Sequence, residues 1–271
     1  SNSIVIEHEG SWYKTSKSWD ELVNHKGLFE KLKKELPGFE KADPVDLNQP
    51  VEAPISNQEI WASGVTYYRS RTARMEESKD SGGGSFYDKV YHAERPELFF
   101  KALPQRTVGH KSNIRIRRDS IWDVPEPELT LFISSEGTIE GYTVGNDVSS
   151  RSIEGENPLY LPQAKSYQNS AAIGPCLLVK EQTLPPDTTI QLTIKRNGQV
   201  MFDNSITIDQ MKRQHDELVG YLYREMDFPY GSYLITGTGI VPPDEFTLQQ
   251  GDEVSISIAG IGTLVNITEQ K

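Results

Sequence analysis

Two glutamates separated by a single residue form the clearest chemical feature of the sequence. They are Glu126 and Glu128, and prolines at positions 125 and 127 hold this segment extended. In an extended segment residues i and i+2 point to the same face, so the two carboxylates lie side by side. Two like charges this close repel each other unless a cation lies between them. The pair therefore indicates either a divalent metal site or a strand edge at which charge and proline block further pairing.

A third carboxylate, Asp147, ends the apolar segment 141–146. An aspartate at the end of a strand is often a turn residue or a helix N-cap. If it lies beside Glu126 and Glu128, the three carboxylates make an oxygen site suited to Mg²⁺ or Mn²⁺. Spacing along the chain does not decide between these two interpretations.

Three further charged residues have the chemistry of an acid or a base. Glu97 and Lys101 bracket an apolar run, and Lys165 ends the proline-containing segment 157–165, for which we expect a rigid loop. Burial raises the pKa of a carboxyl group and lowers that of a lysine, as acid–base catalysis requires. The alternative is that Glu97 and Lys101 are the exposed ends of a strand and that 157–165 is an ordinary loop.

Composition excludes several classes of protein. The chain has 271 residues, one cysteine (Cys176) and a formal net charge of −11. A lone cysteine excludes a disulfide framework and a cysteine-built zinc site. The charge argues against binding to nucleic acid or to anionic membranes. No apolar run approaches the roughly 18 residues of a spanning helix, and the N-terminus does not resemble a signal peptide. We therefore expect a soluble, acidic, globular protein of a reducing compartment, the cytoplasm.

The N-terminal part of the chain predicts a small α/β unit. Residues 4–6 form a short strand, and the capping-box pattern Ser18 to Glu21 opens a helical stretch that is interrupted at Gly27. Prolines then mark an extended linker, so we divide the chain into a unit and linker over 1–56 and a second domain over 57–271.

The second domain is predicted to be mostly β. Alternating or apolar segments indicate strands at 114–117, 129–133, 191–195, 254–258 and 263–267. Asn197-Gly198 predicts a tight hairpin, and apolar spacing predicts one longer helix over 209–226. The expected fold class is α+β, mostly β, with a sandwich or barrel-like domain.

Four short motifs, taken in order, resemble the fumarylacetoacetate hydrolase family. They are Glu126-Pro-Glu128-Leu, Gly141-Tyr-Thr-Val-Gly-Asn-Asp147-Val-Ser, Ile173-Gly-Pro and Thr236-Gly-Thr238. The resemblance begins near residue 58 and runs to the end of the chain. It implies the family's β-roll-like catalytic domain and a homodimer or homotetramer. It also implies a 2-oxo acid ligand and a metal ion held by Glu126, Glu128 and Asp147. The metal would be Mg²⁺, with Mn²⁺ or Ca²⁺ as alternatives.

Further motifs narrow the implied reaction. Carbon–carbon hydrolases of this family carry a histidine where this chain has Ser70, and a serine is no base near neutral pH. Segments 87–91, 95–101 and 156–165 resemble the family's dehydratases of 2-keto-3-deoxy sugar acids, which act in pentose catabolism. This resemblance implies that 2-keto-3-deoxy-D-arabinonate is converted to 2,5-dioxopentanoate, by β-elimination from a metal-stabilised enolate. Glu97 and Lys165 would be the acid–base pair, and the implied substrate-binding residues are Arg151, Thr238 and Lys101.

Other functions remain open at this point. The chain could be an acylpyruvate-type carbon–carbon hydrolase, an oxaloacetate decarboxylase or a non-catalytic binding protein with a vestigial site. The glycine-rich stretch within 76–85 is predicted to be a lid over the bound substrate.

Overall fold

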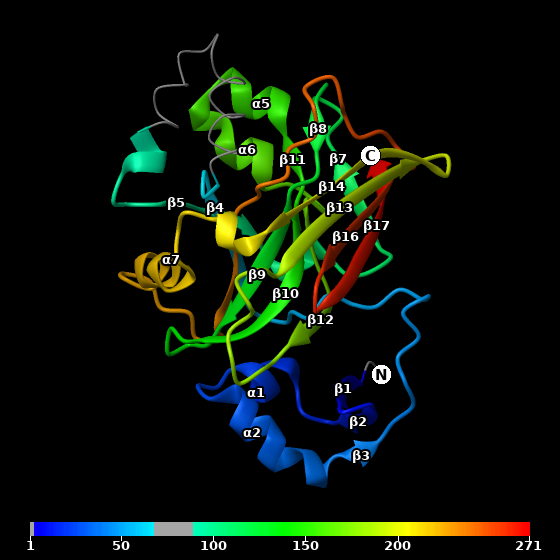
Figure 1. Ribbon diagram of the computed structural model, residues 1–271, viewed down its shortest axis with the longest axis vertical. Helices are drawn as coiled ribbons and strands as arrows, with labels where there is room; N and C mark the ends of the chain where they lie inside the picture. Colours follow the sequence, from blue (N-terminus) through cyan, green and yellow to red (C-terminus); the bar gives the residue numbers. More distant parts are fainter. Residues whose placement is uncertain (1–2, 68–88) are drawn as a thin grey trace.

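The computed structural model describes residues 3–67 and 89–271 of the chain (Figure 1). Ser70 and the predicted lid at 76–85 lie outside the described residues, so both stay predictions. Within the described part of the chain, no helix has the length and apolar character needed to cross a membrane.

The N-terminal unit forms as predicted from its caps and breaks. A three-stranded sheet contains β1 (Ile4–His8), β2 (Ser11–Thr15) and β3 (Glu40–Lys41). Helix α1 (Trp19–Val23) opens with the predicted capping box, in which Ser18 and Glu21 bond each other's backbone N–H groups. Helix α2 (Leu28–Glu35) begins after Gly27, whose φ of 70° ends the preceding turn, and η1 (Leu36–Gly38) follows it.

The unit packs against the larger sheet and shares a core with it. Leu22, Val23 and Leu28 are buried in one cluster with Phe132 and Tyr233 of that sheet. Figure 1 places this unit at the end of the molecule opposite helices α5 and α6. The division at residues 56 and 57 stays a prediction.

A seven-stranded sheet forms the centre of the molecule. Its strand order is β5-β4-β15-β9-β10-β12-β6. The strands are β4 (Glu59–Gly64), β5 (Glu97–Ala102), β6 (Thr107–Val108), β9 (Pro127–Ile133), β10 (Ile139–Asp147), β12 (Ala171–Leu178) and β15 (Ser232–Ile235). Strand β15 pairs parallel to β4 and antiparallel to β9, so a late segment of the chain lies between two early ones.

A five-stranded sheet packs on the first and closes the core. Its order is β14-β13-β16-β17-β7. The strands are β7 (Asn113–Ile116), β13 (Thr189–Arg196), β14 (Gln199–Thr207), β16 (Glu253–Ile258) and β17 (Gly262–Gln270), and a separate small pair contains β8 (Asp123–Val124) and β11 (Ser149–Ser150). Alternate residues of β13 and β16 face β9 and β10 in one hydrophobic cluster. The predicted hairpin at Asn197-Gly198 joins β13 to β14, with positive φ at both residues. The mostly β, α+β fold class is confirmed.

The helices differ from two of the predictions. The helix expected over 209–226 is limited to α7 (His215–Leu222), because a capping box between Gln214 and Glu217 starts it late. Before it, η4 (Ile208–Gln210) is a 3₁₀ turn, and Met211 pairs with Tyr67 as a β-bridge. The region expected to be a rigid loop contains η3 (Pro158–Tyr160) and α6 (Leu161–Lys165), which follow α5 (Arg151–Glu156). Pro158 and Pro162 lie in the first turns of η3 and α6, where the backbone N–H that proline lacks would have no partner within the helix.

Candidate metal and acid–base site

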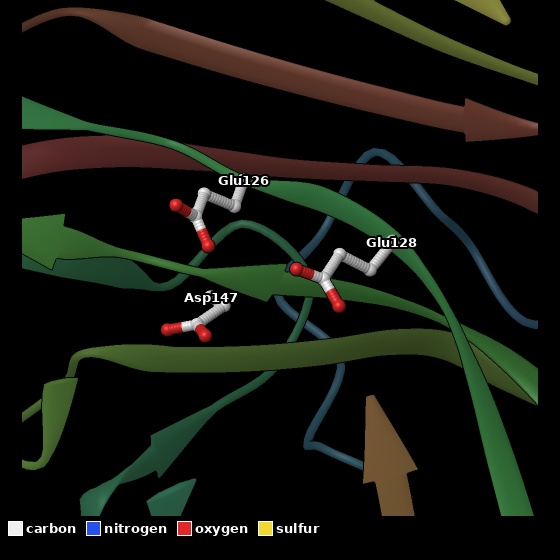
Figure 2. Close-up of side chains that lie close together, drawn as sticks. All are labelled: Glu126, Glu128 and Asp147. Carbon is white, nitrogen blue, oxygen red and sulfur yellow. The ribbon is translucent and has the colours of Figure 1, made fainter. Parts of the chain in front are cut away.

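Strand pairing brings Asp147 to the two glutamates that their spacing had already placed side by side. Glu126 directly precedes β9, Glu128 lies within β9, and Asp147 ends the neighbouring strand β10. The Asp147 N–H donates to the Glu126 carbonyl oxygen at 3.0 Å, which sets these two residues opposite each other. One carboxylate oxygen from each residue lies within 4.8 Å of the other two, and Figure 2 shows the three carboxylates close together.

The carboxylate cluster is buried, and this determines its electrostatics. Glu126, Glu128 and Asp147 are all less than 5% exposed. Burial raises the pKa of Glu128 well above its usual value, and the charges of Asp147 and Glu126 raise it further. The Gly237 N–H donates to Glu128 Oε2 and acts in the opposite direction. Three hard oxygen donors that repel each other in a buried place fit a divalent cation such as Mg²⁺.

Three cations surround the same cluster. Lys165 Nζ lies 2.7 Å from Glu126 Oε2, 3.4 Å from Asp147 Oδ2 and 2.6 Å from Ser149 Oγ. Arg151 donates to Glu126 Oε1 at 2.7 Å. Lys101 Nζ lies 2.5 Å from Asp147 Oδ1. Each buried cation thus has a carboxylate partner, as buried charges require.

A small cavity of about 10 Å³ opens onto the cluster. Its walls are made by Ser63, Gly64, Val65, Phe99, Glu126, Glu128, Asp147, Arg151, Lys165 and Thr238. The predicted residues Arg151, Lys165 and Thr238 therefore face the same space as the carboxylates. Lys101 is absent from these walls, because it lies behind Asp147 and is fully buried. This position is at odds with the prediction that Lys101 binds the substrate.

The Glu97 carboxylate packs against Gly64, one of the residues of the cavity wall. It is the first residue of β5 and pairs with Gly64, the last residue of β4. A Cβ atom added to Gly64 would lie 2.2 Å from Glu97 Oε2, so the carboxylate occupies the space that a side chain would fill. Ser63 Oγ also donates to the Glu97 carbonyl oxygen at 3.0 Å. The absence of a side chain at position 64 therefore allows the Glu97 carboxylate to lie against Gly64, which is a wall residue of the cavity although Glu97 itself is not.

Several wall residues were not predicted from the sequence. Val65 has a φ of 55°, a left-handed conformation that is unusual for a β-branched residue and typical of functional sites. Phe99 packs under the Lys165 ammonium, with 5.7 Å between Nζ and the ring centroid. Nothing in the local pattern distinguishes these two from core residues. Ser149, which binds Lys165, lies two residues after Asp147, and that i, i+2 spacing was a usable signal.

Comparisons with known proteins agree with this architecture. The family model described as "Fumarylacetoacetate (FAA) hydrolase C-terminal" matches residues 60–268. The "Probable 2-keto-3-deoxyxylonate dehydratase" of Haloferax volcanii is 50% identical over 231 residues, which cover 84% of this chain and 78% of the relative. The "2-dehydro-3-deoxy-D-arabinonate dehydratase" of Saccharolobus solfataricus is 43% identical over 223 residues, covering 82% and 75%. A solved structure of 2-keto-3-deoxy-D-arabinonate dehydratase complexed with magnesium and 2,5-dioxopentanoate is similar with a TM-score of 0.84 and 34% identity, covering 99% of this chain and 94% of that one.

Proposed function

Since the chain belongs to the fumarylacetoacetate hydrolase family, we propose that it is a Mg²⁺-dependent dehydratase that converts 2-keto-3-deoxy-D-arabinonate to 2,5-dioxopentanoate. It is thus a hydro-lyase. The observation that carries this proposal is one cavity that holds three buried carboxylates and Lys165, with the Glu97 carboxylate packed on its wall at Gly64.

The two sugar names among the relatives describe the same substrate. In a 2-keto-3-deoxy acid C2 is a ketone and C3 a methylene, so C4 is the remaining stereocentre of the pentose chain. D-xylonate and D-arabinonate share the configuration at C4. The 2-keto-3-deoxyxylonate and 2-dehydro-3-deoxy-D-arabinonate dehydratases named above therefore support one and the same five-carbon acid for this chain.

Glu126, Glu128 and Asp147 would hold the metal ion. When bound, Mg²⁺ supplies a Lewis acid for the keto and carboxylate oxygens of a 2-oxo acid, which favours loss of a proton from C3. The donor set supports Mg²⁺, with Mn²⁺ or Ca²⁺ as substitutes, because carboxylate oxygens suit hard cations.

Glu97 and Lys165 are proposed to move the protons. The Glu97 carboxylate, packed against the wall residue Gly64, can accept the C3 proton. The Lys165 ammonium, held by two carboxylates and Ser149, can donate a proton to the C4 hydroxyl as it leaves. One C–O bond breaks and water leaves, which gives a C3–C4 double bond. A proton then moves from C5 to C3 to form the C4–C5 enol, and transfer of the enol hydroxyl proton to C4 makes the terminal aldehyde. Each positioned acid or base contributes about 10²- to 10⁴-fold to the rate.

Arg151 and Thr238 are proposed to bind the substrate. Both lie on the cavity wall, and a guanidinium presents its planar fork to a carboxylate or a hydroxyl. Arg151 also pairs with Glu126, so it would hold the substrate close to the metal.

A turnover assay with Mg²⁺ and 2-keto-3-deoxy-D-arabinonate tests the function. The product 2,5-dioxopentanoate is followed with a coupled semialdehyde dehydrogenase. We expect turnover that disappears with EDTA and in Glu97→Gln, and that survives in the control Glu253→Gln, whose carboxylate lies on β16. Cleavage of oxaloacetate or an acylpyruvate in place of dehydration would refute the proposed reaction.

Proton exchange separates the two catalytic roles. The analogue 2-oxopentanoate has no C4 hydroxyl, so it can exchange its C3 protons with D₂O but cannot lose water. Glu97→Gln should abolish this exchange, whereas Lys165→Met should leave it measurable while abolishing dehydration. The opposite pattern would reverse the two roles.

We further propose a cytoplasmic homodimer or homotetramer that acts in pentose catabolism. The family resemblance supports the assembly, and the substrate class supports the pathway. Sedimentation velocity at micromolar concentration would test the assembly, and a monomer would contradict it.

A further inference from the structure

The ammonium of Lys101 is surrounded by protein oxygen atoms. It has three N–H donors and no acceptor capacity. It donates hydrogen bonds to the Val148 carbonyl oxygen at 3.0 Å and to the Lys165 carbonyl oxygen at 2.5 Å, and it forms an ion pair with Asp147, whose Oδ1 lies 2.5 Å from Nζ. The residue is 0% exposed. Because it has no exposed surface and is not a wall residue of the cavity, the ammonium is not accessible to a substrate.

Two of these acceptors belong to groups with different proposed tasks. Asp147 is a proposed metal ligand, and Lys165 is the proposed proton donor. Oδ1 of Asp147 faces Lys101, while Oδ2 lies 3.4 Å from Lys165 Nζ. Lys101 therefore determines which oxygen of Asp147 is turned toward the cluster.

The bond to the Lys165 carbonyl fixes the end of helix α6. Carbonyl groups in the last turn of a helix have no partner within the helix, so outside donors must satisfy them. Lys101 Nζ and Ser170 Oγ both donate to this carbonyl, at 2.5 and 2.8 Å. The backbone from which the Lys165 side chain extends is thereby held in place.

We propose that Lys101 is a positioning residue that orients Asp147 for metal binding and Lys165 for proton transfer, without touching the substrate. The inference rests on the proposed function, because it takes Asp147 to be a metal ligand. Partners behind a ligating carboxylate commonly contribute to metal affinity in this way.

Mn²⁺ binding to Lys101→Met, measured by electron paramagnetic resonance, is the direct test. Methionine keeps the length of the side chain and removes its charge and donors. We expect the Kd for Mn²⁺ to rise about 10- to 100-fold. At saturating Mn²⁺, kcat should fall by about 100-fold, as a displaced catalytic group requires, while KM for the sugar acid stays within about twofold of that of the unaltered chain.

A matched control separates positioning from general stability. Arg196 makes a bidentate pair with buried Asp252 at 2.8 Å in the five-stranded sheet, away from the cavity. Arg196→Met should lower Tm and leave the Kd for Mn²⁺ unchanged. If Lys101→Met does not fold, Lys101→Gln can replace it, because glutamine retains two amide donors. Its Kd for Mn²⁺ is expected to lie above that of the unaltered chain, while some binding remains.

Two results would overturn the inference. An unchanged Kd with a raised KM would make Lys101 a substrate ligand. An unchanged Kd and kcat with a lowered Tm would make it a structural residue only. Failure of the unaltered chain to bind Mn²⁺ would instead refute the proposed function, since it removes the metal itself.

Discussion

Replacing Gly64 by alanine should move the Glu97 carboxylate without disturbing the fold. The new Cβ would lie 2.2 Å from Glu97 Oε2 and 2.7 Å from its Cδ. The φ of Gly64 is not in the left-handed region, so the backbone of β4 admits alanine. The clash falls on the end of a flexible side chain, which can rotate away at little cost in folding free energy.

The size of the effect follows from this distance. Ordinary contact with a Cβ atom begins near 3.4 Å, so Oε2 must move by more than 1 Å. A misplacement of 1 Å at a reacting centre costs about 100-fold in rate, which is about 2.7 kcal/mol of transition-state free energy. We therefore expect kcat for dehydration to fall about 100-fold. The Kd for Mn²⁺ should not change, because Glu97 is no part of the carboxylate cluster.

The coupled turnover assay, Mn²⁺ titration and thermal unfolding together check this reasoning. Gly220 in α7 is the matched control, since a Cβ there meets nothing within 4 Å. Gly220→Ala should keep full activity and gain up to about 1 kcal/mol in the free energy of unfolding, because alanine is the better helix former. Near-normal turnover in Gly64→Ala would refute the role of Glu97, and lost Mn²⁺ binding would show that the substitution acts through the cluster.

Three other predictions concern pH and the hairpin. Because the pKa of Glu128 is raised by burial and by Asp147 and Glu126, Mn²⁺ must displace its proton, and the Kd should tighten as pH rises; calorimetry in buffers of different ionisation enthalpy should detect the proton, and its absence would contradict the shift. Burial raises the pKa of Asp123 from 3.8 to about 6, so the stability it contributes below pH 3.8 is lost as pH rises through 6. At 1.36 kcal/mol per pH unit that loss is about 3 kcal/mol, and urea unfolding of Asp123→Asn from pH 4 to 7 should lack it. Gly198 has a φ of 78°, so Gly198→Ala should cost about 1–2 kcal/mol of stability and leave Mn²⁺ binding intact; unchanged urea unfolding would contradict the strain.

Local signals in the sequence account for much of the fold. The Asn197-Gly198 turn and the Ser18 to Glu21 capping box depend on residues close together, and both formed as predicted. The helix over 209–226 was wrong in extent, because apolar spacing continues through Met211 although the capping box starts α7 later. Periodicity reports a buried face but does not report where the hydrogen bonds begin.

The site was predictable where it depends on one strand. Glu126 and Glu128 share a face because of their i, i+2 spacing, and this holds in the structure. The position of Asp147 beside the two glutamates depends on the register in which β9 pairs with β10. In the sequence only the family resemblance, carried by the order of the motifs, indicated this position. The position of Lys101 depends on carbonyl groups of residues 148 and 165, and no pattern of side-chain types records those.

The parallel pairings have a consequence for biosynthesis. Strand β4 can pair with β15, and β7 with β17, only after the later strand of each pair has been synthesised. The two sheets are therefore completed by contacts between segments more than 140 residues apart. Such contacts form late, since ordering the long intervening chain precedes any gain from them. While the ribosome still holds residues 238–270, the carboxylates have been made but the cavity wall at Thr238 and strand β17 are missing. Metal loading is therefore expected only after β17 has left the ribosome and paired with β7. A chain truncated before residue 262 should keep Glu126, Glu128 and Asp147 and still fail to bind Mn²⁺.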